Sequence, residues 1–595
     1  MSDQPNADAT QSLNIAAADV LGRVMRVDTS RVIVDVTEHT ILTRVAVGNL
    51  VAIQGTTLFE YLIGIVDRVT RDTTEVPVLD AEDEQGEIPI QATQRDLIRV
   101  VLVGTYRLGA GDKAPSFKRG ADSFPQVDRP CYLLESGNLQ QLMALFAEGL
   151  AADEQLMLGH FVADRDAVAI ADGNRLFQRH AALLGSTGTG KSWTVALILE
   201  RAAKLKYPNL LVLDMHGEYE PLTAPDKGFA EGFRIAGPGD LDSQKPSILF
   251  LPYWLLNQEE MFALLLDRSD QNAPNQAARF THHVRELKRE ALEAAGQNVT
   301  AATFTVDSPV PYNLGDLLTR LKDDDTEMVQ GSRGDKQGPF YGKLTRFVNR
   351  LETKIDDRRY GFLFQPPAKS KEYSWLGDCA RRLLCSDKDV RGVKVIDFSE
   401  VPADVLPVVT GVLARTLYDV QFWMREEERT PVTFVCDEAH LYLPVAELTG
   451  TAEGRALAAF ERIAKEGRKY GVSLFVISQR PADVSRTILS QCNNFVAMRL
   501  TNDQDQAVVR RLTSESLVGL VDVLPLLDVG EALLLGDAVL LPTRIKMDEP
   551  TIRPASATRA FWTEWGTRKP TPKAIDDAVE AFRRQVRPRG GGSEV

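Results

Sequence analysis

The chain has 595 residues, of which 44% are hydrophobic and 26% are charged, and its formal net charge at pH 7 is −14. This length predicts several domains, and the composition is that of an ordinary globular protein. The excess of acidic residues argues against a protein whose whole surface binds polyanions. It does not exclude a locally basic channel, because binding depends on the local field rather than on the total charge.

No apolar run reaches the length of a membrane span, and the first residues, MSDQPNADATQS, lack the basic and apolar regions of a signal peptide. The sequence therefore predicts no membrane segment. The five cysteines have neither disulfide nor metal-ligand spacing: Cys131, Cys379, Cys385, Cys436 and Cys492. This pattern fits a reducing compartment, and we expect a cytoplasmic location.

The N-terminal part of the chain has the alternation of β-strands. Residues 1–14 are polar and are expected to be disordered, whereas segments such as GRVMRVDTSRVIVDV and YLIGIVDRVTRD alternate apolar and polar residues between turn signals. Short strands with regular turns indicate a small barrel. We therefore expect a β-rich barrel domain over 15–150, with a short helix at NLQQLMALFAEG.

A glycine-rich loop follows an apolar strand at 180–184. The segment from Gly185 to Ser192 reads GSTGTGKS and matches G-x-x-x-x-G-K-[ST], and a helical pattern follows it. Glycines let the backbone N–H groups curl around a polyphosphate, the lysine reaches the β- and γ-phosphates, and the serine hydroxyl is offered to Mg²⁺. The predicted nucleotide-binding residues are Gly185, Ser186, Thr187, Gly188, Thr189, Gly190, Lys191, Ser192 and Trp193.

Further apolar strands after the loop predict a parallel sheet that is buried on both faces. They are separated by helical patterns and read LLVLD, VKVID, VTFVCD, VSLFVIS, FVAMRL and EALLLG. The expected fold class is α/β: a RecA-like P-loop ATPase core over 151–254 and 386–550, with the N-terminal β-barrel domain before it. Residues 255–385 are predicted to form a helical insertion, and 551–595 a C-terminal arm with a helix and a flexible tail.

The strand VTFVCD and the strand after it both end in polar residues that suit phosphoryl transfer. Asp437 is placed to hold Mg²⁺ through water, and Glu438 to polarise the attacking water. Gln479 follows the strand VSLFVIS at the sheet edge where ligands bind, and is predicted to sense the γ-phosphate. The letters DEAH also name a class of helicases, but their spacing from the P-loop and their other motifs are missing. We interpret His440 as a packing residue.

A second polar group follows the strand LLVLD. Asp214, His216 and Glu218 come directly after it in LDMHGEYE, at the same predicted edge of the sheet. A lone histidine is usually a packed one, but three polar groups at one strand end favour a functional role. We include His216 among the nucleotide-binding candidates.

Two arginines are candidates for a contact with a neighbouring subunit's γ-phosphate. Arg468 lies in the basic segment ERIAKEGRKYG before the strand that ends at Gln479, and Arg179 precedes the P-loop strand. Such an arginine neutralises charge in the transition state. The alternative for Arg468 is a solvated basic face.

Together these motifs resemble the HerA-type ATPases of the HerA/FtsK superfamily. The likeness rests on RHAALLGSTGTGKS, LDMHGEY, CDEAHLYLP, IAKEGRKYGVSLFVISQRP and GEALLLGDAVLLP, preceded by a β-rich domain like the family's HAS barrel. The resemblance implies a homohexameric ring that hydrolyses ATP with Mg²⁺ between subunits and pumps double-stranded DNA through its pore. It also implies a nuclease or another effector docked on the barrel face, in DNA end processing or phage defence.

Carried onto matching positions, the resemblance assigns catalytic roles to Lys191, Asp437, Glu438, Gln479 and either Arg468 or Arg179, and Mg²⁺ binding to Ser192 and Asp437. Two alternatives stay open. The hexamer could be an ATP-binding scaffold that activates an effector with little translocation, or a secretion or conjugation ATPase, although those usually carry membrane segments. A motor should hydrolyse ATP faster with duplex DNA, and a scaffold only with its partner.

Overall fold

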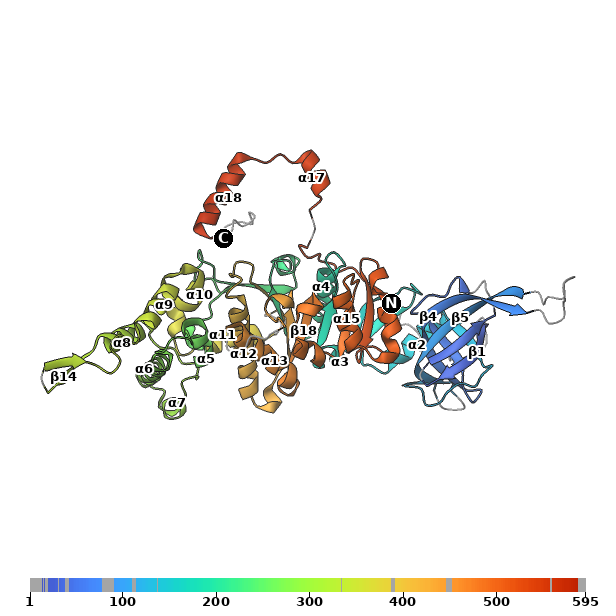
Figure 1. Cartoon of the computed structure of the whole chain (residues 1–595), viewed down its shortest axis with the longest axis horizontal. Helices are drawn as coiled ribbons and strands as arrows, with labels where there is room; N and C mark the ends of the chain where they lie inside the picture. The colour runs from blue at the N-terminus through green and yellow to red at the C-terminus, as the bar shows by residue number, and fades with distance from the viewer. Residues whose placement is uncertain are drawn as a thin grey trace, which may run out of the picture. The chain divides into compact units, whose positions relative to one another are not determined.

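The computed structural model describes residues 13, 15, 20–29, 31–37, 42–77, 90–109, 114–135, 137–332, 334–386, 391–445, 452–556 and 559–586 (Figure 1). The chain forms two compact units. The first comprises 1–201, 479–482 and 492–550, and the second 202–478, 483–491 and 551–595. The predicted disordered N-terminus, apart from Leu13, and the tail beyond 586 lie outside the described residues. None of the described helices is long and apolar enough to cross a membrane.

The first unit begins with a closed barrel, which confirms the predicted β-rich domain. Its sheet has the order β2-β1-β7-β3-β4-β5-β6, and a further pairing of β2 with β5 closes it. The strands are β1 (Val20–Asp28), β2 (Arg31–Val36), β3 (Leu50–Gln54), β4 (Glu60–Pro77), β5 (Ile90–Arg107), β6 (Ser116–Arg119) and β7 (Pro130–Leu134). Alternate residues such as Val32, Val34 and Val36 fill its interior, because successive side chains of a strand point to opposite faces.

The rest of the first unit contributes six strands in the order β10-β19-β20-β21-β8-β9. The elements are α2 (Gly137–Glu148), β8 (Gln155–Phe161), β9 (Val168–Asp172), α3 (Gly173–Gln178), β10 (Ala181–Leu184), α4 (Lys191–Ala202), β19 (Asn494–Ala497), α15 (Asp503–Leu512), α16 (Val518–Val521), β20 (Glu531–Gly536) and β21 (Thr543–Met547). β10 and β19 are parallel, but β20 pairs antiparallel with β19. The expectation that the strand EALLLG is parallel is therefore wrong.

A barrel arginine contacts the turn between β20 and β21. The guanidinium of Arg119, at the end of β6, donates to the carbonyls of Gly536 at 2.7 Å and Leu540 at 2.9 Å, and also to that of Val539. It lies 3.6 Å from the carboxylate of Asp537 in the same turn. Burial lowers the pKa of Arg119, and the nearby Asp537 opposes that shift. This contact joins the barrel to the strands around the glycine-rich loop.

The second unit contains a parallel sheet of six strands in the order β13-β12-β16-β11-β17-β18. The strands are β11 (Leu210–Asp214), β12 (Ala230–Ile235), β13 (Ile248–Leu249), β16 (Val393–Asp397), β17 (Val432–Cys436) and β18 (Val472–Ser478). The central strands are buried along their whole length, as the apolar runs predict. Two helices, α12 (Leu406–Trp423) and α13 (Ala452–Glu466), pack so closely that a Cβ on Gly411 would lie 2.6 Å from Ala456.

The segment between β13 and β16 is mostly helical. It contains α5 (Gln258–Leu265), α6 (Ala273–Ala294), α7 (Asn298–Thr303), α8 (Leu314–Thr326), α9 (Thr345–Asp356), α10 (Gly361–Phe364) and α11 (Trp375–Leu384), with one hairpin of β14 (Met328–Gly331) and β15 (Gly334–Gln337). A half-buried polar contact joins α6 to α8, since Asp324 accepts hydrogen bonds from Arg279 at 2.6 Å and contacts His283 at 2.6 Å. The exact boundaries of the helical insertion stay predictions.

Two helices near the C-terminus, α17 (Phe561–Thr567) and α18 (Pro572–Arg584), have no buried residues. Their apolar side chains are exposed, for example Trp562 at 87% and Phe582 at 73%. In α18 the apolar residues recur at helical spacing and form one face. A helix with an uncovered apolar face usually gains stability from packing against another surface.

Candidate functional site

The glycine-rich loop has the conformation that phosphate binding needs. It connects β10 to α4, and Gly188 and Gly190 have φ angles of 75° and 102°, in the left-handed region where glycine is unstrained. Inside the loop, Thr189 Oγ1 donates to the carbonyl of Ser186 at 2.8 Å, and Lys191 Nζ donates to the same carbonyl at 3.1 Å. The loop thus curls around the lysine, which begins helix α4.

Neighbouring segments hold this loop in place. A Cβ on Gly185 would lie 2.8 Å from Met498 Cβ, which only a glycine avoids, and Gly530 N donates to the carbonyl of Thr189 at 2.8 Å. Ser192 and Trp193 are half-buried at the start of α4. The shape of the loop is therefore fixed by packing within the first unit, and little ordering is needed when a phosphate binds.

Gln479 lies directly against the loop, in the same unit. Its side-chain carbonyl accepts a hydrogen bond of 2.5 Å from the hydroxyl of Thr187. Both side chains are accessible enough to meet a ligand, because Thr187 is exposed and Gln479 half-buried. An amide held at the loop by a hydroxyl can respond to a group that enters the loop, as expected of a γ-phosphate sensor.

The second unit carries the two acids expected at the end of β17. Asp437 is buried, and Glu438 has a φ of 43°, a left-handed conformation that is rare outside glycine. Burial raises the pKa of Asp437 well above its usual range, and the carboxylates of Asp214 and Glu438 raise it further. A cation at Asp437 would therefore be stabilised by several negative groups. Backbone strain of this kind is found at functional sites.

The acid after β11 organises its own loop. The buried Asp214 carboxylate accepts hydrogen bonds from the backbone N–H groups of Gly217 at 2.9 Å and Tyr219 at 2.9 Å, and from two further N–H groups of this loop. Burial raises its pKa to about 6, against the effect of these hydrogen bonds. The side chain of His216 is exposed. Asp214 thus shapes the loop, while the nucleotide contact expected of His216 stays a prediction.

His440 contacts the proposed base, which the sequence did not indicate. Its Nδ1 lies 3.3 Å from Glu438 Oε2 and 3.5 Å from the hydroxyl of Ser478, the last residue of β18. The ring therefore joins the ends of two neighbouring parallel strands. The only available signal was its position two residues after Glu438, which by itself favours packing equally well.

Each of the two candidate arginines lies just before the start of a strand. Both are therefore at the amino ends of their strands, and not at the carboxyl ends. Arg179 comes just before β10, and its guanidinium is paired with Asp537 in the first unit. Arg468 lies in a short 3₁₀-helix, Gly467–Tyr470, before β18, and its side chain is exposed. Among the described residues, the Arg468 guanidinium has no ion-pair or hydrogen-bond partner.

No group of three or more His, Cys, Asp or Glu side chains in the described part of the chain is placed to hold a metal ion. Mg²⁺ usually keeps several waters and takes one or two carboxylates together with substrate phosphates. The buried Asp437 carboxylate, with other acids around it, fits one such ligand. The pairing of Asp437 with the Ser192 hydroxyl stays a prediction.

An α/β core with a phosphate-binding loop between β10 and α4 defines a P-loop ATPase. Residues 156–417 match the family model described as the central domain of helicase HerA. The chain is thus an ATPase with a RecA-like P-loop core and an N-terminal barrel, and its central part is similar to the central domain of HerA-type helicases.

The chain is also similar to individual proteins of known name or structure. A probable helicase of Methanocaldococcus jannaschii is 27% identical over 444 residues, which cover 74% of this chain and 75% of that protein. The DNA double-strand break repair helicase HerA of Pyrococcus furiosus is 26% identical over 410 residues, covering 63% of this chain and 66% of that protein. Among solved structures, VirB4 of Thermoanaerobacter pseudethanolicus has a TM-score of 0.43 and 18% identity, covering 67% of this chain and 98% of that chain.

Glu438→Gln should bind ATP and hydrolyse it at least about 10²-fold more slowly, because an amide cannot accept the proton of the attacking water. Retained nucleotide can be measured by fluorescence of an ATP analogue, and turnover by phosphate release. Glu461→Gln is a suitable control, since Glu461 is an acid on α13 that bonds to Ser485. Rapid phosphate release from Glu438→Gln would assign the base to another residue.

His440→Ala should lower kcat while leaving the KM for ATP nearly unchanged, because the ring contacts the proposed base Glu438. His440→Asn should recover part of the loss, since an amide can still reach a carboxylate. Steady-state kinetics of both variants provide the test. A purely structural role for His440 would instead lower the melting temperature and leave kcat per folded protein unchanged.

Proposed function

We propose that the chain is an ATP-driven motor that moves double-stranded DNA through a homohexameric ring in the cytoplasm. Support comes from the P-loop with its sensor Gln479, the acids at the end of β17, and relatives that are named as DNA double-strand break repair helicases. The observation that carries the proposal is the ordered phosphate-binding loop of a HerA-type core. The process served is DNA end processing or phage defence.

In this proposal ATP binds at 185–193. The backbone N–H groups of the loop hold the phosphates, Lys191 neutralises the β- and γ-phosphates, and Ser192 and Asp437 hold Mg²⁺. Bound Mg²⁺ neutralises charge on the phosphates. Glu438 takes the proton of the attacking water, and Gln479 reports the presence of the γ-phosphate.

Ring assembly has a candidate surface at the C-terminus. Helices α17 and α18 expose Trp562, Trp565 and Phe582, and a monomer leaves this apolar surface in water. Burying such side chains is worth about 25 cal/mol per Å² of apolar surface, enough to favour association when several are covered. We propose that another subunit of the ring covers them.

The effector partner is proposed to dock on an exposed apolar patch of the barrel. Leu58 is 71% exposed and Phe59 is 59% exposed, on the turn between β3 and β4. The hydroxyl of Ser123 bonds to Glu60 at 2.9 Å and so ties this turn to the loop of Phe124, which is 51% exposed. Aromatic side chains grouped on a surface are typical of binding hot spots.

Phe59→Ser should weaken partner binding about 30-fold, the effect expected when an interface loses a buried aromatic anchor. ATP hydrolysis by the isolated protein should be unchanged, because the patch lies outside the nucleotide-binding residues. Co-purification with the adjacent effector gene product, followed by titration, measures the loss. Deleting residues 1–110 is a poorer test, since β6 and β7 would remain without the strands that close the barrel.

The motor and the scaffold differ in what stimulates hydrolysis. For a motor we expect ATPase turnover to rise with linear duplex DNA of increasing length, and to rise less with the partner alone. Triplex displacement by the wild-type chain, with Lys191→Ala as the inactive control, tests movement along DNA directly. Stimulation by the partner together with complete indifference to DNA would reject the motor.

A further inference from the structure

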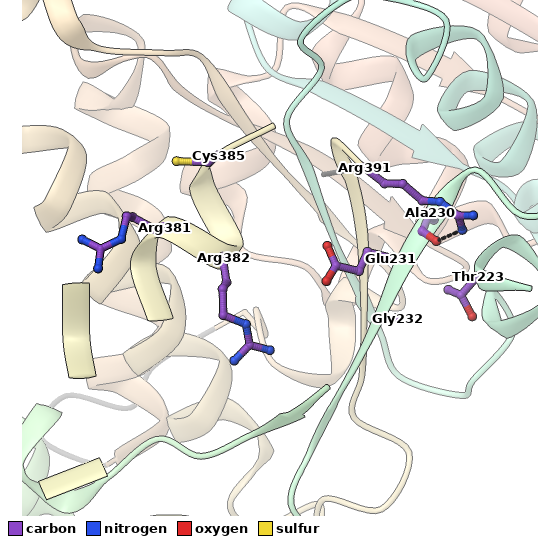
Figure 2. A pocket seen from close by; sticks show the side chains of 8 residues that line it. All are labelled: Thr223, Ala230, Glu231, Gly232, Arg381, Arg382, Cys385 and Arg391. Carbon is purple, nitrogen blue, oxygen red and sulfur yellow. Dashed lines mark hydrogen bonds between the residues drawn. The ribbon is translucent and has the colours of Figure 1, made fainter. Parts of the chain in front are cut away.

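Two further features of the second unit lie outside the residues assigned to ATP hydrolysis. One is a cavity of about 520 Å³ where β12 and β16 begin. Its arginines do not converge on one ligand, because Arg391 bonds to the Ala230 carbonyl and is turned away from Arg382, on the far side of Glu231 (Figure 2). The other is an exposed aromatic surface at the end of α12, and its side chains are better placed to meet a partner.

This aromatic surface consists of Trp423, Phe422, Tyr470 and Arg462. Trp423 is the last residue of α12, and its side chain is 82% exposed. Its ring packs edge-on against Phe422 with 5.4 Å between the ring centres, and Phe422 lies 5.0 Å from Tyr470. The guanidinium of Arg462 lies over Phe422 at 5.5 Å. Because these neighbours support Trp423, little side-chain freedom is lost when a partner covers it.

The arginine proposed to act on a neighbouring subunit belongs to the same part of the second unit. Arg468 and Tyr470 share one short 3₁₀-helix, and the contact of Tyr470 with Phe422 packs this helix against the end of α12. The side chains of Arg468 and Lys469 are both exposed. A subunit that receives Arg468 therefore comes close to Trp423 as well.

A protein fits the aromatic surface better than a nucleic acid does. Three exposed glutamates at 426–428 follow Trp423 closely in the chain, and their charge repels phosphates. Tryptophan, tyrosine and arginine are the residue types enriched at the centres of protein interfaces, and charged residues commonly surround such centres. The composition of this surface is thus that of a protein-binding site.

A second exposed apolar surface borders the phosphate-binding loop in the first unit. The Gly530 N–H donates to the Thr189 carbonyl at 2.8 Å, so the residues just before Gly530 lie beside the loop. Among them Leu526 is 75% exposed and Val529 is 48% exposed. Asp528 is also exposed, and its carboxylate accepts a hydrogen bond from the Val529 N–H but has no ion-pair partner among the described residues.

We propose that Trp423 of one copy of the chain docks on Leu526 and Val529 of a second copy, beside the phosphate-binding loop of that copy. The two surfaces are complementary, because each has an apolar centre and the basic 3₁₀-helix of one copy meets Asp528 of the other. Since the surfaces differ, the contact is head-to-tail, the kind that can close into a ring. The inference rests on the proposed homohexamer and names side chains that hold it together. An exposed ion pair at its rim contributes little, so Lys469 alone is dispensable.

Cross-linking between two different chains tests the contact directly. Full-length chains carry Cys385→Ser, which removes the exposed cysteine, together with either Trp423→Cys or Leu526→Cys. The two preparations are mixed at a concentration high enough for assembly, and a short bismaleimide should then join them into covalent dimers that neither preparation forms alone. In the matched control Leu58→Cys takes the place of Leu526→Cys. Leu58 is a similarly exposed leucine of the barrel, and it should not cross-link to position 423.

Substitutions measure how much the contact contributes to assembly. Trp423→Ser and Leu526→Ser should each raise the concentration at which half of the subunits are assembled about tenfold or more, as expected for the loss of an apolar anchor. Sedimentation measures this concentration. The double variant should be little worse than either single one, because both remove the same contact. Trp423→Phe should assemble better than Trp423→Ser, and Tyr207→Ser, which removes another exposed aromatic side chain of the second unit, should assemble like the wild type.

The outcomes separate this contact from the ring itself. If the wild type assembles but both serine variants assemble equally well and no cross-link forms, the contact is rejected and the ring stands. A wild-type chain that stays monomeric at every concentration rejects both. Normal assembly of Trp423→Ser with loss of DNA binding would assign the aromatic surface to nucleic acid. Normal assembly of Leu526→Ser with a raised KM for ATP would assign the loop surface to the nucleotide, and either result overturns the proposal.

Discussion

Lys191→Ala should reduce ATP hydrolysis by about 10³-fold or more, because removing a preorganised charge that faces the phosphates costs on that scale. In the structure the ammonium donates to the Ser186 carbonyl inside the curled loop, so it already lies where the β- and γ-phosphates are expected. Alanine should leave the backbone unchanged, since residue 191 lies in helix α4 and alanine is compatible with a helix. Phosphate release at saturating ATP measures the loss.

The control for this substitution is Lys206→Ala. Lys206 is exposed beyond the end of α4 and contacts the Tyr207 ring, away from the loop. It should retain full turnover, and the melting temperatures of both variants should match the wild type, because neither side chain anchors the core. Wild-type turnover in Lys191→Ala would reject the assignment of the P-loop, whatever its shape.

Local sequence patterns predicted much of the fold, because they reflect interactions between residues that are close together in the chain. The loop at 185–192 depends on glycines at fixed offsets, and the buried strands depend on apolar runs, both of which are visible in the letters. The barrel was predicted from the alternation of apolar and polar residues between short turns. In each case neighbouring residues along the chain determine the backbone that the structure shows.

Features that depend on distant parts of the chain could not be predicted in this way. The direction of β20 is set by its short connection to β21 and by pairing with β19, although its apolar run looks like that of a parallel strand. The contact between His440 and Ser478 joins two strand ends 38 positions apart. The contacts of Arg119 with the turn at 536–540 span more than 400 positions, and no periodicity in the sequence reports them.

The same limit applies to two neighbouring arginines of helix α11. Arg381 and Arg382 are adjacent in sequence and chemically identical, so the sequence gives no reason to expect different contacts for them. In the structure Arg381 is paired with Asp378, while Arg382 lies over the ring of Phe233 in strand β12. The two side chains therefore have different contacts, and only the three-dimensional arrangement shows this.

Arg468→Ala should lower ATP turnover of the assembled ring by about 10³-fold, the range in which an arginine supplied to a γ-phosphate acts. Arg468 is favoured over Arg179 because its guanidinium is exposed and has no partner among the described residues, whereas Arg179 would first have to leave Asp537. A guanidinium supplied by a neighbour neutralises charge that grows in the transition state. It also makes hydrolysis depend on assembly.

Mixing subunits distinguishes action between chains from action within one chain. In the proposed ring, Lys191→Ala and Arg468→Ala should each be nearly inactive alone. Mixed rings would contain interfaces that join an intact loop to an intact arginine, so part of the activity should return. The matched control is Lys469→Ala, which removes the neighbouring exposed cation of the same short helix and should leave turnover unchanged. If mixing restores nothing while hexamers still form, Arg468 does not act between subunits. The same experiment with Arg179→Ala then decides the alternative, because release of Asp537 at a subunit interface would free that arginine for the same contact.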